Sequence, residues 1–95
     1  MPEMRFQIEW PDGAKDLCYS PSLVIKEYFE PGKTYELTDF VSRARESLTI
    51  ASDRVKAKYG SPCGLALGQL QSIEQTATQY EANPSSQVRV LAFVE

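Results

Sequence analysis

Two short segments carry residue types that could recognise an anion. Ser20-Pro21-Ser22 and Ser61-Pro62-Cys63 each place a hydroxyl group beside a proline, a combination typical of the first residues of a helix. Backbone amides at a helix N-terminus bind anions, and a thiol such as that of Cys63 becomes more acidic there. The alternative interpretation is that each segment only caps its helix. The sequence contains no histidine that could activate a serine or a cysteine.

Three basic residues would complete an anion site if they lie on one side of a helix. Arg54 and Lys58 are four residues apart, and Arg43 precedes Arg54 by about three helical turns. Arg54 and Lys58 repel each other at this spacing, which points to an anionic partner. The ordinary interpretation is a solvated helix face. The candidate ligand-binding residues are therefore Ser20, Ser22, Arg43, Arg54, Lys58, Ser61 and Cys63.

The sequence offers little for catalysis or metal binding. Histidine, the commonest metal ligand and general base, is absent, and a zinc site made of cysteine alone needs four thiolates where the chain has two cysteines. We therefore assign no catalytic residue, no metal and no cofactor. A small enzyme that uses Cys63 or Cys18 as its nucleophile is kept as a third hypothesis, which selective alkylation of one thiol would support.

Composition argues against several classes of protein. A chain of 95 residues with 42% hydrophobic residues suits one folded domain, expected over residues 1–95. The net charge of −3 argues against nucleic-acid binding, which depends on Lys and Arg. No run of about 18 apolar residues is present to cross a membrane, and residues 1–5 lead into no signal-peptide pattern. We therefore expect a cytoplasmic protein.

The two ends of the chain predict strands. Residues 4–10 alternate between apolar and polar types, and residues 15–20 follow the turn sequence Pro11-Asp12-Gly13, so residues 4–20 predict a hairpin. Residues 88–94 form a nearly continuous apolar run, which is typical of a strand inside a sheet. We expect that strand to pair beside the first one. Residues 34–37 predict a brief extended segment.

Two long helices are expected between these strands. Apolar residues recur every three or four positions over residues 39–59, with Thr38 as the N-cap and Gly60 at the C-terminal end. The Ser61-Pro62 pair predicts a second helix over residues 62–81, before a loop at residues 83–86.

Residues 23–29 are ambiguous. β-branched residues favour a strand there, whereas the preceding Ser20-Pro21-Ser22 favours one or two helical turns, which is the interpretation that we prefer. Tyr28 and Phe29 belong either to the core or to an exposed aromatic patch for a protein partner, and core burial is preferred.

These elements predict an α+β fold. A small antiparallel sheet, made of the N-terminal hairpin and the C-terminal strand, would have two longer helices packed on one face. A three-stranded sheet is thin, and its exposed edge could recruit a second copy, so a homodimer is expected.

The second predicted helix has an unusual polar face. It carries amides and hydroxyls where a solvated helix usually carries Glu and Lys, and these residues are Gln69, Gln71, Ser72, Gln75, Thr76, Thr78 and Gln79. Charged residues are depleted from the cores of protein interfaces. The pattern therefore indicates a surface that contacts another protein.

Four strings of the sequence resemble a known family. They are Trp10-Pro11-Asp12-Gly13, then Cys18-Tyr19-Ser20-Pro21-Ser22-Leu23-Val24-Ile25-Lys26, then Leu48-Thr49-Ile50-Ala51-Ser52-Asp53-Arg54-Val55 with Lys58-Tyr59-Gly60, and last Leu65-Ala66-Leu67-Gly68-Gln69-Leu70 through Glu74. Together they make the chain similar to a small bacterial family of nitrogen-starvation response proteins, encoded in a cluster beside a nitrilase gene. The resemblance covers nearly the whole chain.

The resemblance implies that the protein acts under nitrogen limitation and that neighbouring genes encode enzymes. It assigns no reaction and no catalytic residues to this chain. Our leading hypothesis is a non-catalytic accessory or interaction protein, bound to an enzyme of the nitrilase-associated pathway. The second hypothesis is a binding module for a small anionic metabolite, which would use the helix starts and basic residues named above.

Overall fold

The N-terminal alternation of apolar and polar residues folds into a β-hairpin. The structure is a computed structural model that describes residues 3–61, 64–83 and 86–95. Strands β1 (Met4–Glu9) and β2 (Lys15–Ser20) pair antiparallel. In the turn between them the Trp10 amide donates to the Ala14 carbonyl oxygen at 2.7 Å, and Gly13 takes a φ of 91°, which suits a residue without a side chain. The predicted hairpin is confirmed.

The C-terminal strand lies inside the sheet, as its apolar run predicts. β4 (Gln87–Val94) pairs antiparallel with β1 on one side and with β3 (Thr34–Glu36) on the other, giving the order β2-β1-β4-β3. A β-bulge interrupts the β1–β4 ladder, since Gln7 lies opposite Ala92 while Ile8 lies opposite Val90. The extended segment expected at residues 34–37 is thus a fourth strand, because it finds a partner in the far edge of β4.

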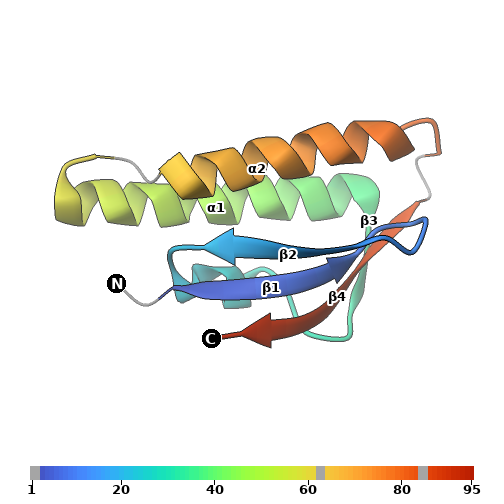
Figure 1. The fold of residues 1–95 in the computed structure, drawn as a ribbon, viewed down its shortest axis with the longest axis horizontal. Helices are drawn as coiled ribbons and strands as arrows, with labels where there is room; N and C mark the ends of the chain where they lie inside the picture. Colours follow the sequence, from blue (N-terminus) through green and yellow to red (C-terminus); the bar gives the residue numbers. More distant parts are fainter. Residues whose placement is uncertain (1–2, 62–63, 84–85) are drawn as a thin grey trace.

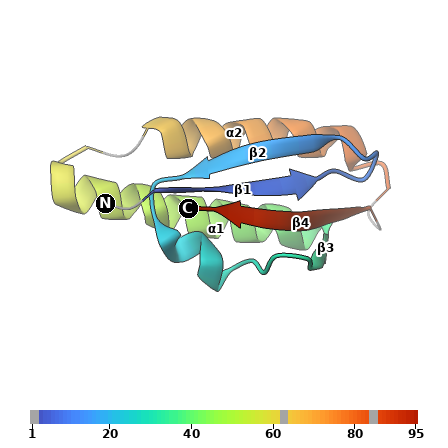
Figure 2. The same cartoon turned by 60° about the horizontal axis from the view of Figure 1, so that its bottom comes forward.

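Both long helices cover the same face of the sheet, so the predicted α+β fold is confirmed. Helix α1 (Leu37–Tyr59) and helix α2 (Gly64–Ala77) lie side by side in one layer, with the strands in the other (Figures 1 and 2). A short 3₁₀ helix, η2 (Thr78–Tyr80), extends α2. Within the described residues, no helix is both long enough and apolar enough to cross a membrane.

The core lies between the sheet and the helix pair. Phe6 from β1 stacks on Phe29 with ring centroids 5.9 Å apart, and Phe29 packs at 5.3 Å against Phe40 of α1. Trp10 continues the cluster, since its ring lies 5.8 Å from that of Phe40 and 5.7 Å from that of Tyr80. This aromatic cluster joins the sheet, the segment between β2 and β3, α1 and η2.

The segment between β2 and β3 is helical, as preferred from the sequence. It contains the 3₁₀ helix η1 (Leu23–Glu27), and its buried residues include Ile25. The N-cap is Ser22, whose Oγ accepts a hydrogen bond from the Val24 amide at 3.3 Å. Phe29 is buried, so the preferred core interpretation of this residue is confirmed.

Some predicted helix ends differ from the structure. Thr38 is not the N-cap of α1, because the helix begins at Leu37, whose amide donates to the Ser86 carbonyl oxygen at 2.9 Å. A tertiary contact thus replaces the expected side-chain cap. The predicted helix start at Pro62 and Cys63 lies outside the described residues, as do residues 84–85 of the predicted loop.

Candidate functional site

The structure brings three of the candidate binding residues together, at the start of η1. The Ser22 Oγ accepts a hydrogen bond from Arg54 Nη1 at 3.1 Å, in addition to the cap bond from the Val24 amide. The Ser20 Oγ donates to the Ser22 carbonyl oxygen at 2.8 Å and accepts from the Ser22 amide at 3.3 Å. Both serines are buried. An anion at this place would have to displace contacts that hold the segment in shape.

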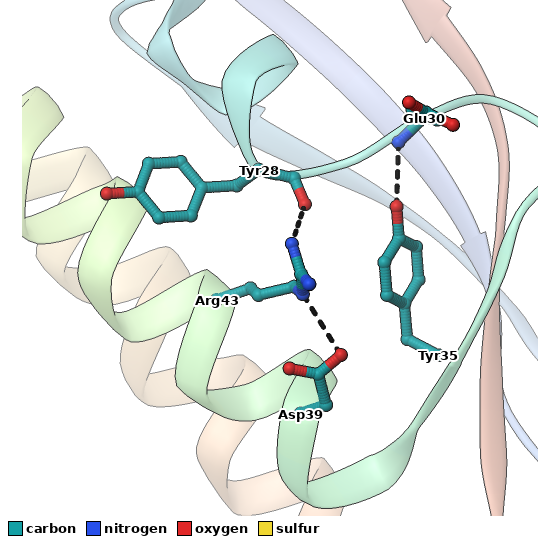
Figure 3. Close-up of polar contacts among 5 residues, drawn as sticks. All are labelled: Tyr28, Glu30, Tyr35, Asp39 and Arg43. Carbon is teal, nitrogen blue, oxygen red and sulfur yellow. Dashed lines mark hydrogen bonds and ion pairs between the residues drawn. The ribbon is translucent and has the colours of Figure 1, made fainter.

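Arg43 makes a second junction, at the other end of η1. Its Nη1 donates to the carbonyl oxygen of Tyr28, the C-cap residue, at 2.9 Å, while its Nε donates to Asp39 Oδ2 at 3.0 Å (Figure 3). The guanidinium carbon also lies 5.1 Å from the ring centroid of Tyr35. The Tyr35 hydroxyl in turn accepts a hydrogen bond from the Glu30 amide at 2.9 Å.

The spacing of Arg43 and Arg54 therefore has a structural consequence. About three turns apart on α1, the two guanidinium groups bracket η1, one at its N-cap and one at its C-cap. Together they tie α1 to the segment that connects β2 with β3. The Nζ of Lys58, the remaining cation of the set, lies 5.5 Å from the ring centroid of Tyr59.

Of the two candidates near the second helix start, the structure describes only Ser61. Ser61 is exposed and follows the end of α1. Cys63 lies outside the described residues, so its role as an anion ligand or nucleophile stays a prediction. Within the described part of the chain, no group of three or more Cys, Asp or Glu side chains is arranged to hold a metal ion.

The Cys18 thiol is held in its neutral form. Its side chain is buried, and burial raises the pKa of Cys18 to about 12, with a smaller contribution from the negative charge of Asp16. A thiol nucleophile reacts as the thiolate. At neutral pH this residue therefore behaves as a small hydrophobic side chain of the core.

The two helices form a groove of about 390 Å³ on their outer side. Its lining includes Leu37, Val41 and Ala77, together with the ion pair between Arg45 and Glu74, whose closest atoms are 2.7 Å apart. Glu81 also lines the groove, so two acidic residues face one basic residue. This charge does not favour a small anion.

The outer face of α2 stands out among the described surfaces. Leu65 and Leu67 are 70% and 43% exposed. Every exposed residue of α2 is uncharged, and these residues are Gly64, Leu65, Leu67, Gly68, Gln71, Ser72 and Gln75. The one charged residue of α2, Glu74, is half-buried and paired with Arg45.

The neighbouring helix provides an internal comparison. The exposed residues of α1 include many charged ones, namely Asp39, Arg45, Glu46, Asp53, Arg54, Lys56 and Lys58. Both helices are amphipathic and pack on the same sheet, so the lack of charge is a property of α2 alone. The amide-rich tract in the sequence indicated this face, whereas the exposed leucines were recognisable only once the packing of α2 was known.

Gly64 and Gly68 do not serve packing inside the domain. No described atom beyond the backbone of the helix and the adjoining residues lies within 4 Å of the position that a Cβ would occupy at either glycine. With Ser72 they form a stripe of small residues at four-residue spacing along the exposed face. Such a stripe lets the backbone of another helix approach closely.

Comparison with known proteins supplies the family. Searches of curated proteins and of solved structures found no match to this chain. A family model described as "Nitrogen starvation-induced protein NitG" matches residues 5–93, which confirms the nitrogen-starvation resemblance. The chain belongs to this family of nitrogen starvation-induced proteins.

Proposed function

We propose that this protein is a non-catalytic interaction protein of the nitrogen-starvation response, which binds a partner enzyme in the cytoplasm through the outer face of α2. The single observation that supports this function is the exposed, uncharged surface around Leu65 and Leu67. Exposed leucines in an uncharged setting contribute to binding, because their apolar area leaves water when a partner covers it.

The residues of the outer face of α2 indicate what kind of surface a partner would present. Two leucines beside Gly64 and Gly68 fit an apolar helix that packs closely on α2, with Gln71 and Gln75 offering hydrogen bonds at the rim. The gene neighbourhood implied by the resemblance points to an enzyme encoded beside this protein, in the nitrilase-associated cluster. Such an enzyme would carry the chemistry, and this domain would hold or regulate it.

The test is an affinity capture from nitrogen-starved cells of the native host. Tagged wild-type protein should retain a cluster-encoded enzyme, and the Leu65→Gln/Leu67→Gln variant should lose it. Full burial of a leucine contributes about 1.5–3 kcal/mol, and Leu65 and Leu67 have 70% and 43% of their surface left to bury. The double change should therefore cost about 2–3 kcal/mol and weaken binding on the order of 100-fold.

The matched control is Leu17→Gln, which makes the same chemical change at a 57% exposed leucine of β2. It should capture the enzyme as well as the wild type does. Loss of the enzyme from Leu17→Gln alone, or its retention by Leu65→Gln/Leu67→Gln, would contradict the proposed face.

The alternative function is a module for a small anionic metabolite at Ser20, Ser22 and Arg54. Those groups are brought together, but they already bond to one another. Phosphate, nucleotides or amino acids at about 100 times their dissociation constant would raise the stability by about 2.7 kcal/mol if this function were correct. We expect unchanged melting curves.

A further inference from the structure

The face of the sheet opposite the helices is open. Figure 2 shows β2, β1 and β4 in front of α1 and α2, and none of the described helices lies over the front of these strands. The register places side chains of neighbouring strands in rows across this face. Lys15, Glu9, Arg89 and Thr34 form one row, Leu17, Gln7 and Ala92 form the next, and Tyr19, Arg5 and Val94 form the third.

Glu9 and Arg89 in the first row are neighbours that do not pair. They lie directly opposite each other on β1 and β4, where oppositely charged side chains usually attract. Among the described residues, neither of them forms an ion pair. Arg5 in the third row differs, because its guanidinium lies 4.0 Å from Glu3 and over the ring of Tyr19. Lys15, beside Glu9 on the edge strand β2, forms no ion pair among the described residues either, so Glu9 and Arg89 are the charges of the two central strands that are left for a partner.

The arrangement of these charges is self-complementary. A twofold axis parallel to the strands, between β1 and β4, would place β1 of one copy over β4 of the other. Glu9 of each copy then faces Arg89 of the second copy, so both ion pairs form at once. In the next row Gln7 faces Ala92, and in the third row Arg5 faces Val94. No pair of like charges is brought together in the central strands.

We propose that two copies of this protein form a homodimer through the open faces of their sheets, with reciprocal Glu9–Arg89 ion pairs. A face is a better surface than an edge in this fold. β3 has only three residues, and the Tyr19 amide on the edge of β2 already donates to Gln69 Oε1 at 3.0 Å. The sequence alone favoured edge-to-edge pairing, which would have to disrupt that contact at β2 or rely on the three residues of β3.

The size of the face sets the strength of the dimer. Four strands at about 4.8 Å spacing and six residues at about 3.3 Å rise give a flat area of roughly 400 Å² on each copy. Stable protein complexes bury about 800 Å² on each partner, so this interface belongs to the small class. The dimer should therefore dissociate at micromolar concentration. It also leaves the outer face of α2 free, because α2 lies on the opposite side of the sheet (Figure 1).

Sedimentation equilibrium with charge-reversed variants tests the dimer. The wild type should change from monomer to dimer over the micromolar range. Glu9→Arg and Arg89→Glu should each stay monomeric, because in a dimer of either variant both ion pairs are replaced by two side chains of like charge. An equimolar mixture of the two variants should dimerise again, since each arginine then meets a glutamate. The double variant Glu9→Arg/Arg89→Glu should dimerise by itself for the same reason. Rescue in the mixture requires both variants to be folded, so it also controls for misfolding.

Three outcomes would overturn the proposal. One is a wild type that stays monomeric at about 1 mM. Another is a mixture that stays monomeric while both variants melt cooperatively. The third is a Glu9→Arg variant that dimerises when mixed with an Arg5→Glu variant and not when mixed with Arg89→Glu. That result would indicate a twofold axis perpendicular to the strands, which places β1 of one copy over β1 of the other. Leu65→Gln/Leu67→Gln should remain dimeric, so failure of the dimer and failure of partner binding through α2 give different results.

Discussion

Gln69 of α2 accepts a hydrogen bond from the Tyr19 backbone amide of β2 at 3.0 Å. This bond joins the helix with the uncharged outer face to the edge strand of the sheet. It also occupies a backbone N–H donor at the edge of the sheet, where a strand of another chain could otherwise pair with it. One glutamine thus fixes α2 on the sheet and protects the sheet edge.

Replacement of Gln69 by leucine tests this contact. The change removes the acceptor and leaves the part-buried Tyr19 amide without it, which should lower the free energy of unfolding by about 1 kcal/mol. Gln71→Leu is the matched control, because Gln71 is exposed and should change stability by less than about 0.5 kcal/mol. Urea denaturation measures both. Equal effects of the two substitutions would show that the Gln69 contact contributes nothing.

Arg43 should contribute more to stability than its exposed ion pair suggests. Arg43→Ala removes the bond to the Tyr28 carbonyl, the pair with Asp39 and the contact with the Tyr35 ring, with an expected loss of about 1–2 kcal/mol. Arg43→Lys should recover less than half of this loss, because an ammonium group cannot reach both oxygens in the same geometry.

The control for Arg43 is Arg45→Ala. Arg45 forms an exposed pair with Glu74, and such pairs contribute less than about 1 kcal/mol. A loss at position 45 as large as that at position 43 would mean that the bracketing of η1 has no special role. Thermal and urea unfolding of the three variants decide between these outcomes.

The Cys18 thiol should be unreactive in the folded protein. In a Cys63→Ser background, a disulfide reagent at about pH 8 should modify Cys18 only after urea unfolds the chain, because burial raises the pKa of Cys18 to about 12. Fast modification of the native Cys63→Ser protein would revive the cysteine-enzyme hypothesis for Cys18.

The same shift makes stability depend on pH in alkaline solution. Above the ordinary pKa of 9.0 the unfolded chain loses the thiol proton, while the folded chain keeps it until about 12. Unfolding is therefore increasingly favoured through this window, by roughly 1–2 kcal/mol at about pH 10.5. Cys18→Ala should lack this part of the pH dependence. Urea unfolding of both proteins at about pH 8 and about pH 10.5 measures the difference, and parallel curves would contradict the shift.

The overall fold could be predicted from the sequence because its strongest patterns are local. The alternation around Phe6 and the Pro11-Asp12-Gly13 turn specify the hairpin, and the apolar run ending at Val94 specifies an interior strand. β3 was harder to recognise, since three residues carry no periodicity. Its conformation depends on the ladder with β4, a contact between residues far apart in the chain.

The candidate site was less predictable, because a side chain's role depends on what it meets. Arg43 and Arg54 were correctly placed on one side of α1, yet the sequence did not show that η1 would lie between their guanidinium groups. The exposed side of Leu67 was likewise hidden, since the apolar face of α2 is set by Ala66, Leu70 and Ile73 packing on the sheet.

Gly68 should separate stability from binding. Glycine inside a helix costs about 1 kcal/mol relative to alanine, and a Cβ at Gly68 would contact no described atom outside its own stretch of helix, so Gly68→Ala should stabilise the isolated protein by about 0.5–1 kcal/mol. If a partner helix packs on this stripe, Gly68→Leu should abolish capture of the partner without unfolding the protein. Melting curves and affinity capture are run on the same preparations. Binding of the partner by Gly68→Leu at the wild-type level would contradict this expectation.

The most direct test of the account is site-specific photocrosslinking in nitrogen-starved cells. A photoreactive residue at Gln71, in the exposed face of α2, should form a covalent adduct with the proposed partner enzyme. The same residue at Lys56, exposed on α1, is the matched control and should form none. An adduct from position 56 but not from position 71, or no adduct from position 71 although the enzyme is present, would contradict the claim that α2 binds the partner.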